Sequence, residues 1–243
     1  MSQKVFISFG GGPPGVIDAV KRIVRQATNI NLFDKLIGYT DKDLKEDPEF
    51  WPKHGKFIVK NRRGYGYWLW KPYLIKKTME QLKDGDVLLY CDAGCEINYK
   101  NTGVKNKLRD YLNNQIQKEI IIGYPLGCKD GDWTKGDLLD HFNVRKNKAV
   151  INTGTRQGGV NMFHVNKKTR NLVNIWYETA CNYRLLDDSP SKSPNLPGFK
   201  QNRHDQAIFS ILTKLHRLYS KKFTLRGVII TARNKSGKSR LKL

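Results

Sequence analysis

The sequence lacks several features that would place it in other classes of protein. No apolar run approaches the roughly 20 residues that span a bilayer, and the first 15 residues, MSQKVFISFGGGPPG, contain no hydrophobic region of signal-peptide length. Cysteine is scarce: four occur in 243 residues, at positions 91, 95, 128 and 181, and none forms a CxxC pair. We therefore expect reduced thiols and a cytoplasmic protein rather than a disulfide-stabilised secreted one.

Acidic residues are also scarce. The chain has 22 Asp and Glu against 44 Lys and Arg, a net charge of +22, which predicts an anionic partner such as nucleic acid, a membrane surface or a phosphorylated substrate. The last 13 residues, TARNKSGKSRLKL, carry five cations and no acid. We expect residues 231–243 to be a solvated, mobile tail that holds the protein near an anionic membrane surface or a phosphate-bearing acceptor. The alternative is an ordered segment that folds over the donor diphosphate.

Hydrophobic periodicity predicts an α/β fold. Apolar runs and 3.6-residue patterns alternate through the first half of the chain, which is typical of a mostly parallel central sheet flanked by helices. The second half alternates less regularly, so we expect one domain over residues 1–230 with an elaborated C-terminal half. The expected strands cover 4–10, 35–41, 87–91, 119–125, 158–166 and 226–231, and the expected helices cover 16–27, 71–82, 169–183 and 204–219.

An acid stands at the carboxyl end of the most apolar of these strands. Asp92 follows the run VLLYC and is itself followed by Ala93 and Gly94. In open α/β sheets, ligands bind outside the carboxyl ends of the strands, where a carboxylate can hold a metal ion. Gly94 would let a bulky anion approach the backbone. The alternative is a plain strand end with an Asx turn.

Two further segments combine charge with polar or aromatic side chains. The stretch NRRGYGYWLWKPY places Arg63 and Lys71 beside glycines and aromatics at a helix entrance, where they could contact phosphates. Trp70 could stack on a sugar or base, or pack in the core. In QNRHDQAIF, Asp205 stands at a helix start between His204 and Gln206, which indicates either a site wall or a solvated helix edge.

Four motifs together resemble those of GT-A glycosyltransferases. The segment YCDAGCEIN resembles the Asp-x-Asp motif of that family, and RGYGYWLWKPYLI, GGVNMFHVNK and RHDQAIFSIL resemble its donor-side, glycogenin-type strand and Asp-Gln segments. They occur in the expected order between Arg63 and Leu212. The resemblance implies a GT-A (Rossmann-like) domain that transfers a sugar from a nucleotide sugar, with UDP favoured, to a glycan or other hydroxyl acceptor. It also favours retention at the anomeric carbon, and a viral or bacterial source.

The resemblance also implies a role for each matching residue. It assigns donor binding to residues 1–100 and acceptor binding to residues 101–230. The implied donor-binding residues are Ser8, Phe9, Tyr39, Thr40, Asp41, Arg63, Lys71, Asp92, Ala93 and Gly94. The implied acceptor-side residues are Gly158, Gly159 and Trp70, and the implied catalytic residues are Asp205, His204 and Gln206.

The metal site departs from the family pattern, because Gly94 stands where the second aspartate would be. Asp92 is the retained ligand for Mn²⁺ or Mg²⁺. The missing ligand could come from the diphosphate with His204 or Asp205, or from Glu96. Alternatively, metal dependence could be weak, with Arg63 and Lys71 supplying the positive charge.

Two other classes of protein fit parts of the sequence. A nucleic-acid binder would explain the charge, but no recognised nucleic-acid motif is present and the aromatics cluster in one segment. A sugar nucleotidyltransferase usually has a glycine-rich loop with a cation after its first strand. The corresponding segment here, FGGGPPG, has the glycines but no Lys or Arg.

Overall fold

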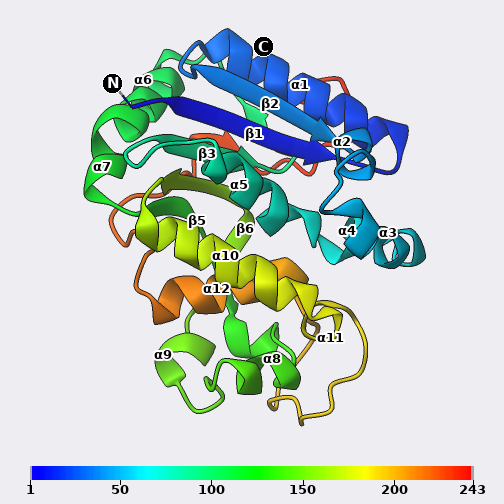
Figure 1. The fold of residues 1–243 in the computed structure, drawn as a ribbon. Coiled ribbons are helices and arrows are strands. Elements are labelled where there is room, and N and C mark those ends of the chain that lie inside the picture. Colours follow the sequence, from blue (N-terminus) through cyan, green and yellow to red (C-terminus); the bar gives the residue numbers. More distant parts are fainter. Residues whose placement is uncertain (1, 242–243) are drawn as a thin grey trace.

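The computed structural model describes residues 2–241, and its centre is a five-stranded sheet of order β2-β1-β3-β6-β5 (Figure 1). Three parallel strands, β1 (Lys4–Gly10), β2 (Lys35–Thr40) and β3 (Val87–Cys91), form one half. The long strand β6 (Gly154–His164) is antiparallel to β3, and β5 (Ile121–Lys129) is antiparallel to β6. Four strands therefore point the same way, and only β6 is reversed in this sheet.

Helices connect the strands in both halves of the chain. Those of the first half are α1 (Pro14–Ile30), α2 (Asp41–Lys45), α3 (Trp51–Lys60), α4 (Gly64–Tyr67) and α5 (Trp70–Glu80). Those of the second half are α6 (Thr102–Asp110), α7 (Ile116–Lys118), α8 (Gly136–His141), α9 (Lys148–Ile151), α10 (Lys167–Cys181), α11 (Tyr183–Leu186) and α12 (His204–Leu215). A π-helical turn at Tyr111–Gln115 joins α6 to α7.

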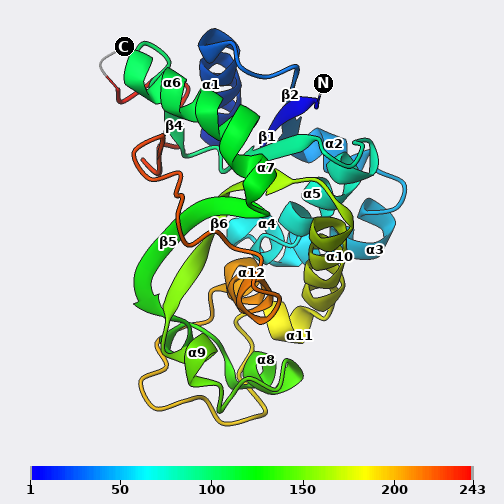
Figure 2. The same ribbon diagram turned by 90° about the vertical axis from the view of Figure 1, so that its left-hand side faces the viewer.

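Alternate residues of the strands pack into two separate helix layers. Phe6 and Leu89 pack with residues of α1 and α6 on one face of the sheet. Ile7 and Tyr90 pack with residues of α5, α10 and α12 on the other face. This alternation follows the two-residue period of a strand buried on both sides. Beyond α12, the small helices α8 and α9 extend the C-terminal half (Figures 1 and 2).

This architecture confirms the predicted single α/β domain with a mostly parallel, helix-flanked sheet and an elaborated C-terminal half, as expected of a GT-A domain. Within residues 2–241, no helix has the length and apolar character needed to cross a bilayer.

Three local predictions were wrong. No helix was expected between residues 42 and 66, yet this segment contains the helix α3. Strand β6 begins at Gly154 rather than Gly158. The strand expected at 226–231 is reduced to β7 (Ile229–Ile230), which leaves the main sheet and pairs with β4 (Glu96–Ile97). This pairing brings the C-terminal segment to the end of β3.

The prediction of a mobile C-terminal tail was also wrong for residues 231–241; the last two residues lie outside the described part. The buried guanidinium of Arg22, on α1, binds both the tail and the segment that follows β3. It donates to the carbonyl oxygens of Ala93 (2.7 Å) and Cys95 (3.0 Å), and to those of Asn234 (3.1 Å) and Ser236. One side chain therefore satisfies four backbone acceptors and ties the two segments together.

Glu96 holds the tail from the other side. Its fully buried carboxylate accepts from Ser239 Oγ (2.5 Å), Asn234 Nδ2 (2.7 Å) and the backbone N–H of Arg240 (3.1 Å). Burial alone would raise the pKa of Glu96, but these hydrogen bonds outweigh burial and lower the pKa to about 2. Glu96 is therefore a structural anion and not the missing metal ligand.

We predict that Glu96→Gln lowers the free energy of unfolding by about 1 to 3 kcal/mol near neutral pH, because hydrogen bonds to a charged group are lost. The pKa of Glu96 lies below its ordinary value of 4.5, so its contribution is present above about pH 4.5 and is lost as the pH falls toward 2. Denaturant titrations across this range should show the difference between wild type and variant shrinking at low pH. A difference that does not change with pH would contradict the assignment.

Candidate active site

The candidate site forms where β3 ends against β6. The backbone N–H of Asp92 donates to the carbonyl of Gly159 (2.7 Å), so the strand end is fixed to the reversed strand. Tyr90 donates its hydroxyl to Asp92 Oδ1 (2.6 Å), which sets the direction of the carboxylate. The Asp92 side chain is 39% exposed, so a ligand can reach it.

A buried lysine joins Asp92 to a second carboxylate. Lys71, in the first turn of α5, places Nζ 3.3 Å from Asp92 Oδ1 and 3.0 Å from Asp205 Oδ2. Asp205 lies in the first turn of α12, and the side chains of Lys71 and Asp205 are each 4% exposed. Residues from β3, α5 and α12 thus meet in one cluster, the Asp92–Lys71–Asp205 cluster, in which only Asp92 is open to solvent.

Burial and charge act in opposite directions within this cluster. Burial raises the pKa of Asp205 to about 6, although Lys71 pulls it down. Burial would lower the pKa of Lys71, but the two carboxylates outweigh it and the pKa of Lys71 is raised. Lys71 therefore stays protonated, and above about pH 6 the cluster carries one net negative charge.

Two glycines make room for the carboxylates. A Cβ added to Gly159 would collide with Asp92 Oδ2, and one added to Gly158 would lie 3.2 Å from Asp205 Oδ2. The N–H of Gly158 also faces Gln206 Oε1 at 3.4 Å. The structure therefore brings the predicted residues Gly158, Gly159 and Gln206 beside the cluster.

His204 lies outside this cluster, although it adjoins Asp205 in sequence. Its Nδ1 donates to the carbonyl of Leu186 (2.8 Å), and its ring stacks on Trp68 with 5.4 Å between centroids. Its Nε2 lies 3.7 Å from Asp188 Oδ1. The backbone of His204 has φ of +54°, which turns this side chain toward the loop after α11. These contacts position a loop, and the catalytic role of His204 stays a prediction.

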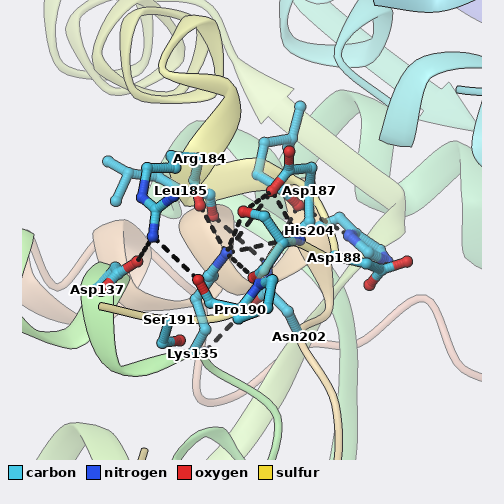
Figure 3. A network of polar contacts seen from close by, with 12 residues as sticks. Lys135, Asp137, Arg184, Leu185, Asp187, Asp188, Pro190, Ser191, Asn202 and His204 are labelled. Atoms are coloured by element: carbon cyan, nitrogen blue, oxygen red, sulfur yellow. Dashed lines mark hydrogen bonds and ion pairs between the residues drawn. The ribbon is translucent and has the colours of Figure 1, made fainter. Parts of the chain in front are cut away.

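That loop is held by a buried lysine that sequence reasoning missed (Figure 3). Lys135 Nζ donates to the carbonyl oxygens of Arg184 (2.6 Å) and Ser189 (2.8 Å) and lies 3.7 Å from the Asp187 carboxylate. Burial lowers the pKa of Lys135. No local pattern in its TKGD segment marks it, because its partners lie about 50 residues away in the chain.

Arginines from three segments lie near one another. Arg63, which directly precedes α4, donates to Asp188 Oδ2 (2.8 Å) and remains partly exposed. Arg203 stacks its guanidinium on the Trp133 ring at 3.9 Å. Burial lowers the pKa of Arg203, and the nearby charges of Arg233 and Arg63 lower it further. Sequence reasoning assigned donor binding to Arg63 and noted Arg203 beside Asp205 at the helix start, but it missed Arg233.

The sequence predicted that an anion would approach the backbone at Gly94, but the C-terminal backbone lies there instead. A Cβ on Gly94 would lie 3.1 Å from the Cα of Arg233, so the close approach that this glycine permits is made by the C-terminal backbone. Ala93 is also buried, and its carbonyl accepts from Arg22. An anion could therefore meet the side chain of Arg233 here, while the Gly94 backbone itself is covered.

Several predicted ligand-binding side chains lie in the core. Trp70 is 5% exposed, donates Nε1–H to the Gly64 carbonyl (3.0 Å), and packs on Phe9 with 4.0 Å between ring centroids. Phe9 is buried as well, and Ser8 is fully buried with no hydrogen-bond partner for its hydroxyl. The aromatic cluster under a loop, left open as the alternative for Trp70, is what the structure contains. None of these three side chains is placed where a sugar or base could stack.

The predicted residues at the carboxyl end of β2 make local contacts. Thr40 donates its N–H (2.7 Å) and hydroxyl (2.8 Å) to Asp43, which caps α2. Asp41 pairs with Lys45 at 2.7 Å. Tyr39 places its hydroxyl 3.1 Å from that of Thr78. These residues lie at the edge where a nucleotide was expected, but each is already engaged.

The described residues do not form a metal site by themselves. Across residues 2–241, no three His, Cys, Asp or Glu side chains lie close enough together to hold a metal ion. Asp92 offers one accessible carboxylate, while Asp205 is paired with Lys71 and Glu96 faces the tail. This donor set does not fit a resident Mn²⁺ or Mg²⁺.

Comparisons with known proteins give only distant similarities. The sequence matches no protein-family model and no curated protein. Among solved structures, mouse xyloside xylosyltransferase 1 has a TM-score of 0.46 at 10% identity, covering 90% of this chain and 84% of that protein. The bifunctional glycosyltransferase WbbM gives 0.44 at 12% identity, over 92% of this chain but 38% of its own. A glycosyltransferase involved in glycosylating the major capsid of PBCV-1 gives 0.39 at 11%, over 73% and 66%.

All three similar structures are glycosyltransferases. At these identities and TM-scores the similarity transfers no activity to this chain, and any assignment rests on the site itself.

Replacing Lys71 tests the cluster. We predict that Lys71→Met lowers the free energy of unfolding by about 3 kcal/mol at pH 8, because Asp205 would remain buried without its counter-ion. Asp205 takes up a proton near pH 6, so the deficit should be smaller at pH 5. Denaturant titrations at both pH values measure it, with Lys76→Met on the exposed side of α5 as the control. A deficit that does not depend on pH would contradict the pairing.

Proposed function

We propose that the protein transfers a sugar from a nucleotide diphosphate sugar, with UDP favoured, to a hydroxyl of a glycan acceptor. The observation that supports this most is the convergence of four motif segments, far apart in sequence, on one strand end. Lys71, Asp92, Gly159 and Asp205 each come from a different segment that resembles the GT-A family, and they lie in direct contact. A chance set of four matches would not be expected to meet at one point.

Binding of the donor diphosphate is assigned to the arginines around the cluster. A departing nucleoside diphosphate gains negative charge, which fixed cations stabilise. Arg63, Arg203 and Arg233 lie near one another, the Arg233 backbone packs against Gly94, and guanidinium groups bind phosphate oxygens in bidentate fashion. This extends the predicted donor set of Arg63 and Lys71. Lys71 itself serves as the internal counter-ion, because it is buried between two carboxylates.

Roles within the cluster follow from exposure. Asp92 is the carboxylate that contacts the ligand, since it alone of the three is accessible. Asp205 acts through Lys71 as a positioning residue and does not reach the acceptor directly. The donor half at residues 1–100 and the acceptor half at residues 101–230 remain part of this proposal. So does retention at the anomeric carbon, which rests on the family resemblance.

Metal dependence is proposed to be weak, because the protein contributes one accessible carboxylate and a rim of fixed cations. A divalent cation would enter with the diphosphate rather than reside in the protein.

The activity is tested with Asp92→Asn. We expect the wild type to be stabilised thermally by a UDP-sugar from a panel of nucleotide sugars, with and without Mn²⁺, since a ligand that binds only the native state raises its stability. The variant should fold normally yet lose turnover by at least about 100-fold, as when an electrostatic group is removed from an active site. Asp18→Asn, an exposed acid on α1, is the matched control. No stabilisation by any nucleotide sugar, or full turnover by Asp92→Asn, would overturn the proposal.

A pH profile tests the role of Asp205. Its pKa is raised to about 6, so we predict that turnover falls as the pH drops below about 6, when protonation weakens its hold on Lys71. Asp205→Asn should turn over more slowly at every pH and should not show this fall below about pH 6. Measuring kcat/KM between pH 5 and pH 8 for both proteins checks the assignment. If Asp205→Asn shows the same fall in turnover below about pH 6, that fall belongs to another titrating group.

A further inference from the structure

The helix that sequence reasoning missed, α3, presents an amphipathic face. His54 and Ile58 point inward and are buried, and His54 Nε2 contacts the Tyr177 hydroxyl at 2.9 Å. The outward side combines apolar and basic side chains. We call it the α3 face, and it consists of Trp51, Pro52, Lys53, Lys56, Val59 and Lys60.

The apolar part of the α3 face is open to solvent. Val59 is 70% exposed, whereas the other exposed large hydrophobic residues in the described chain, Leu215 and Ile230, are 39% and 38% exposed. The indole of Trp51 packs against Gly55. A Cβ added to Gly55 would lie 2.8 Å from the ring, so only glycine leaves room for the indole. These side chains, with Lys56, line a shallow surface hollow.

The charged part of the α3 face is uniformly positive. Helix α3 contains three lysines and no acid, and Arg62 and Arg63 follow it directly. Within residues 2–241, no carboxylate lies at ion-pair distance from Lys56 or Lys60, whereas Lys42, Lys45, Lys76 and Lys77 all have acidic partners. The face therefore leaves its positive charge available to an external anion.

The α3 face lies at the same end of the molecule as the candidate site. Figure 1 shows α3 beside α2 and α4, at the end of the sheet to which β1 and β2 point. Arg63 follows Lys60 by three residues and is one of the arginines proposed above to bind the donor diphosphate. A partner bound to α3 would therefore lie next to the site.

We propose that the α3 face docks the protein on an anionic lipid bilayer. Lysines attract acidic headgroups, a tryptophan lies well at the headgroup level, and an exposed valine gains by entering the acyl boundary. A nucleic acid would use the lysines but would leave Val59 in water. This places membrane contact on α3 instead of the C-terminal tail, whose backbone is bound by Arg22 and Glu96. Membrane binding does not require catalysis, so it is tested independently of the proposed reaction.

The test is sedimentation with vesicles of phosphatidylcholine mixed with phosphatidylserine, compared with phosphatidylcholine alone. Lys56→Gln with Lys60→Gln should weaken binding to the acidic vesicles about 25-fold, since each cation near such a surface contributes about fivefold. The matched control is Lys107→Gln with Arg109→Gln, which removes the same charge from exposed positions on α6. It should leave binding close to that of the wild type.

A second variant separates apolar contact from charge. Val59→Ser keeps the charge and should weaken binding several-fold, and this loss should persist at high salt, which screens the lysines. A blue shift of fluorescence on vesicle binding that disappears in Trp51→Phe would place α3 at the membrane, independently of variant stability.

The proposal is overturned if both double variants lose binding equally, because binding would then follow total charge. It is also overturned if the wild type does not sediment with acidic vesicles. Loss of oligonucleotide binding without loss of vesicle binding in the α3 variant would assign the face to nucleic acid instead.

Discussion

The candidate site depends on the two ion pairs that the Lys71 ammonium makes with Asp92 and Asp205. A buried charge is costly unless it is paired, and here one cation is paired with two acids at 3.0 and 3.3 Å. The three residues come from the start of α5, the end of β3 and the start of α12, so the same contact fixes three elements of the fold. Gly158 and Gly159 on β6 belong to this arrangement because larger residues would displace the carboxylates. Stability and the proposed function therefore depend on the same atoms.

Local patterns in the sequence predicted a large part of this arrangement. The run VLLYC followed by an acid placed Asp92 correctly at a strand end, and the periodic pattern after Arg203 placed Asp205 at a helix start. Both are local signals that chain neighbours determine. Their meeting through Lys71 was not predictable in that way, since Lys71 and Asp205 are far apart in the chain and only tertiary packing joins them.

The failures have the same physical origin. A tail with five cations was expected to be solvated, yet two internal residues, Arg22 and Glu96, bind its backbone and polar side chains. Composition describes a segment's average preference for water and cannot show a specific partner 138 or more residues away. Trp70 was misassigned for a related reason: an aromatic ring in a glycine-rich stretch serves the core or a ligand equally well on sequence grounds. Its packing on Phe9 decides for the core.

Charge distribution links the site to the whole chain. Above about pH 6 the Asp92–Lys71–Asp205 cluster has one net negative charge, which would repel a diphosphate. A protein with a net charge of +22 produces an attractive field at long range, but salt screens it within about 8 Å at physiological ionic strength. Close to the cluster, attraction must therefore come from fixed neighbours. Arg63, Arg203 and Arg233 are the cations proposed for this role, and the tail that carries Arg233 is bound at Gly94 through the Asn234 N–H. Glycine at position 94 thus has two consequences: it adds no negative charge beside Asp92, and it makes room for the backbone that carries Arg233.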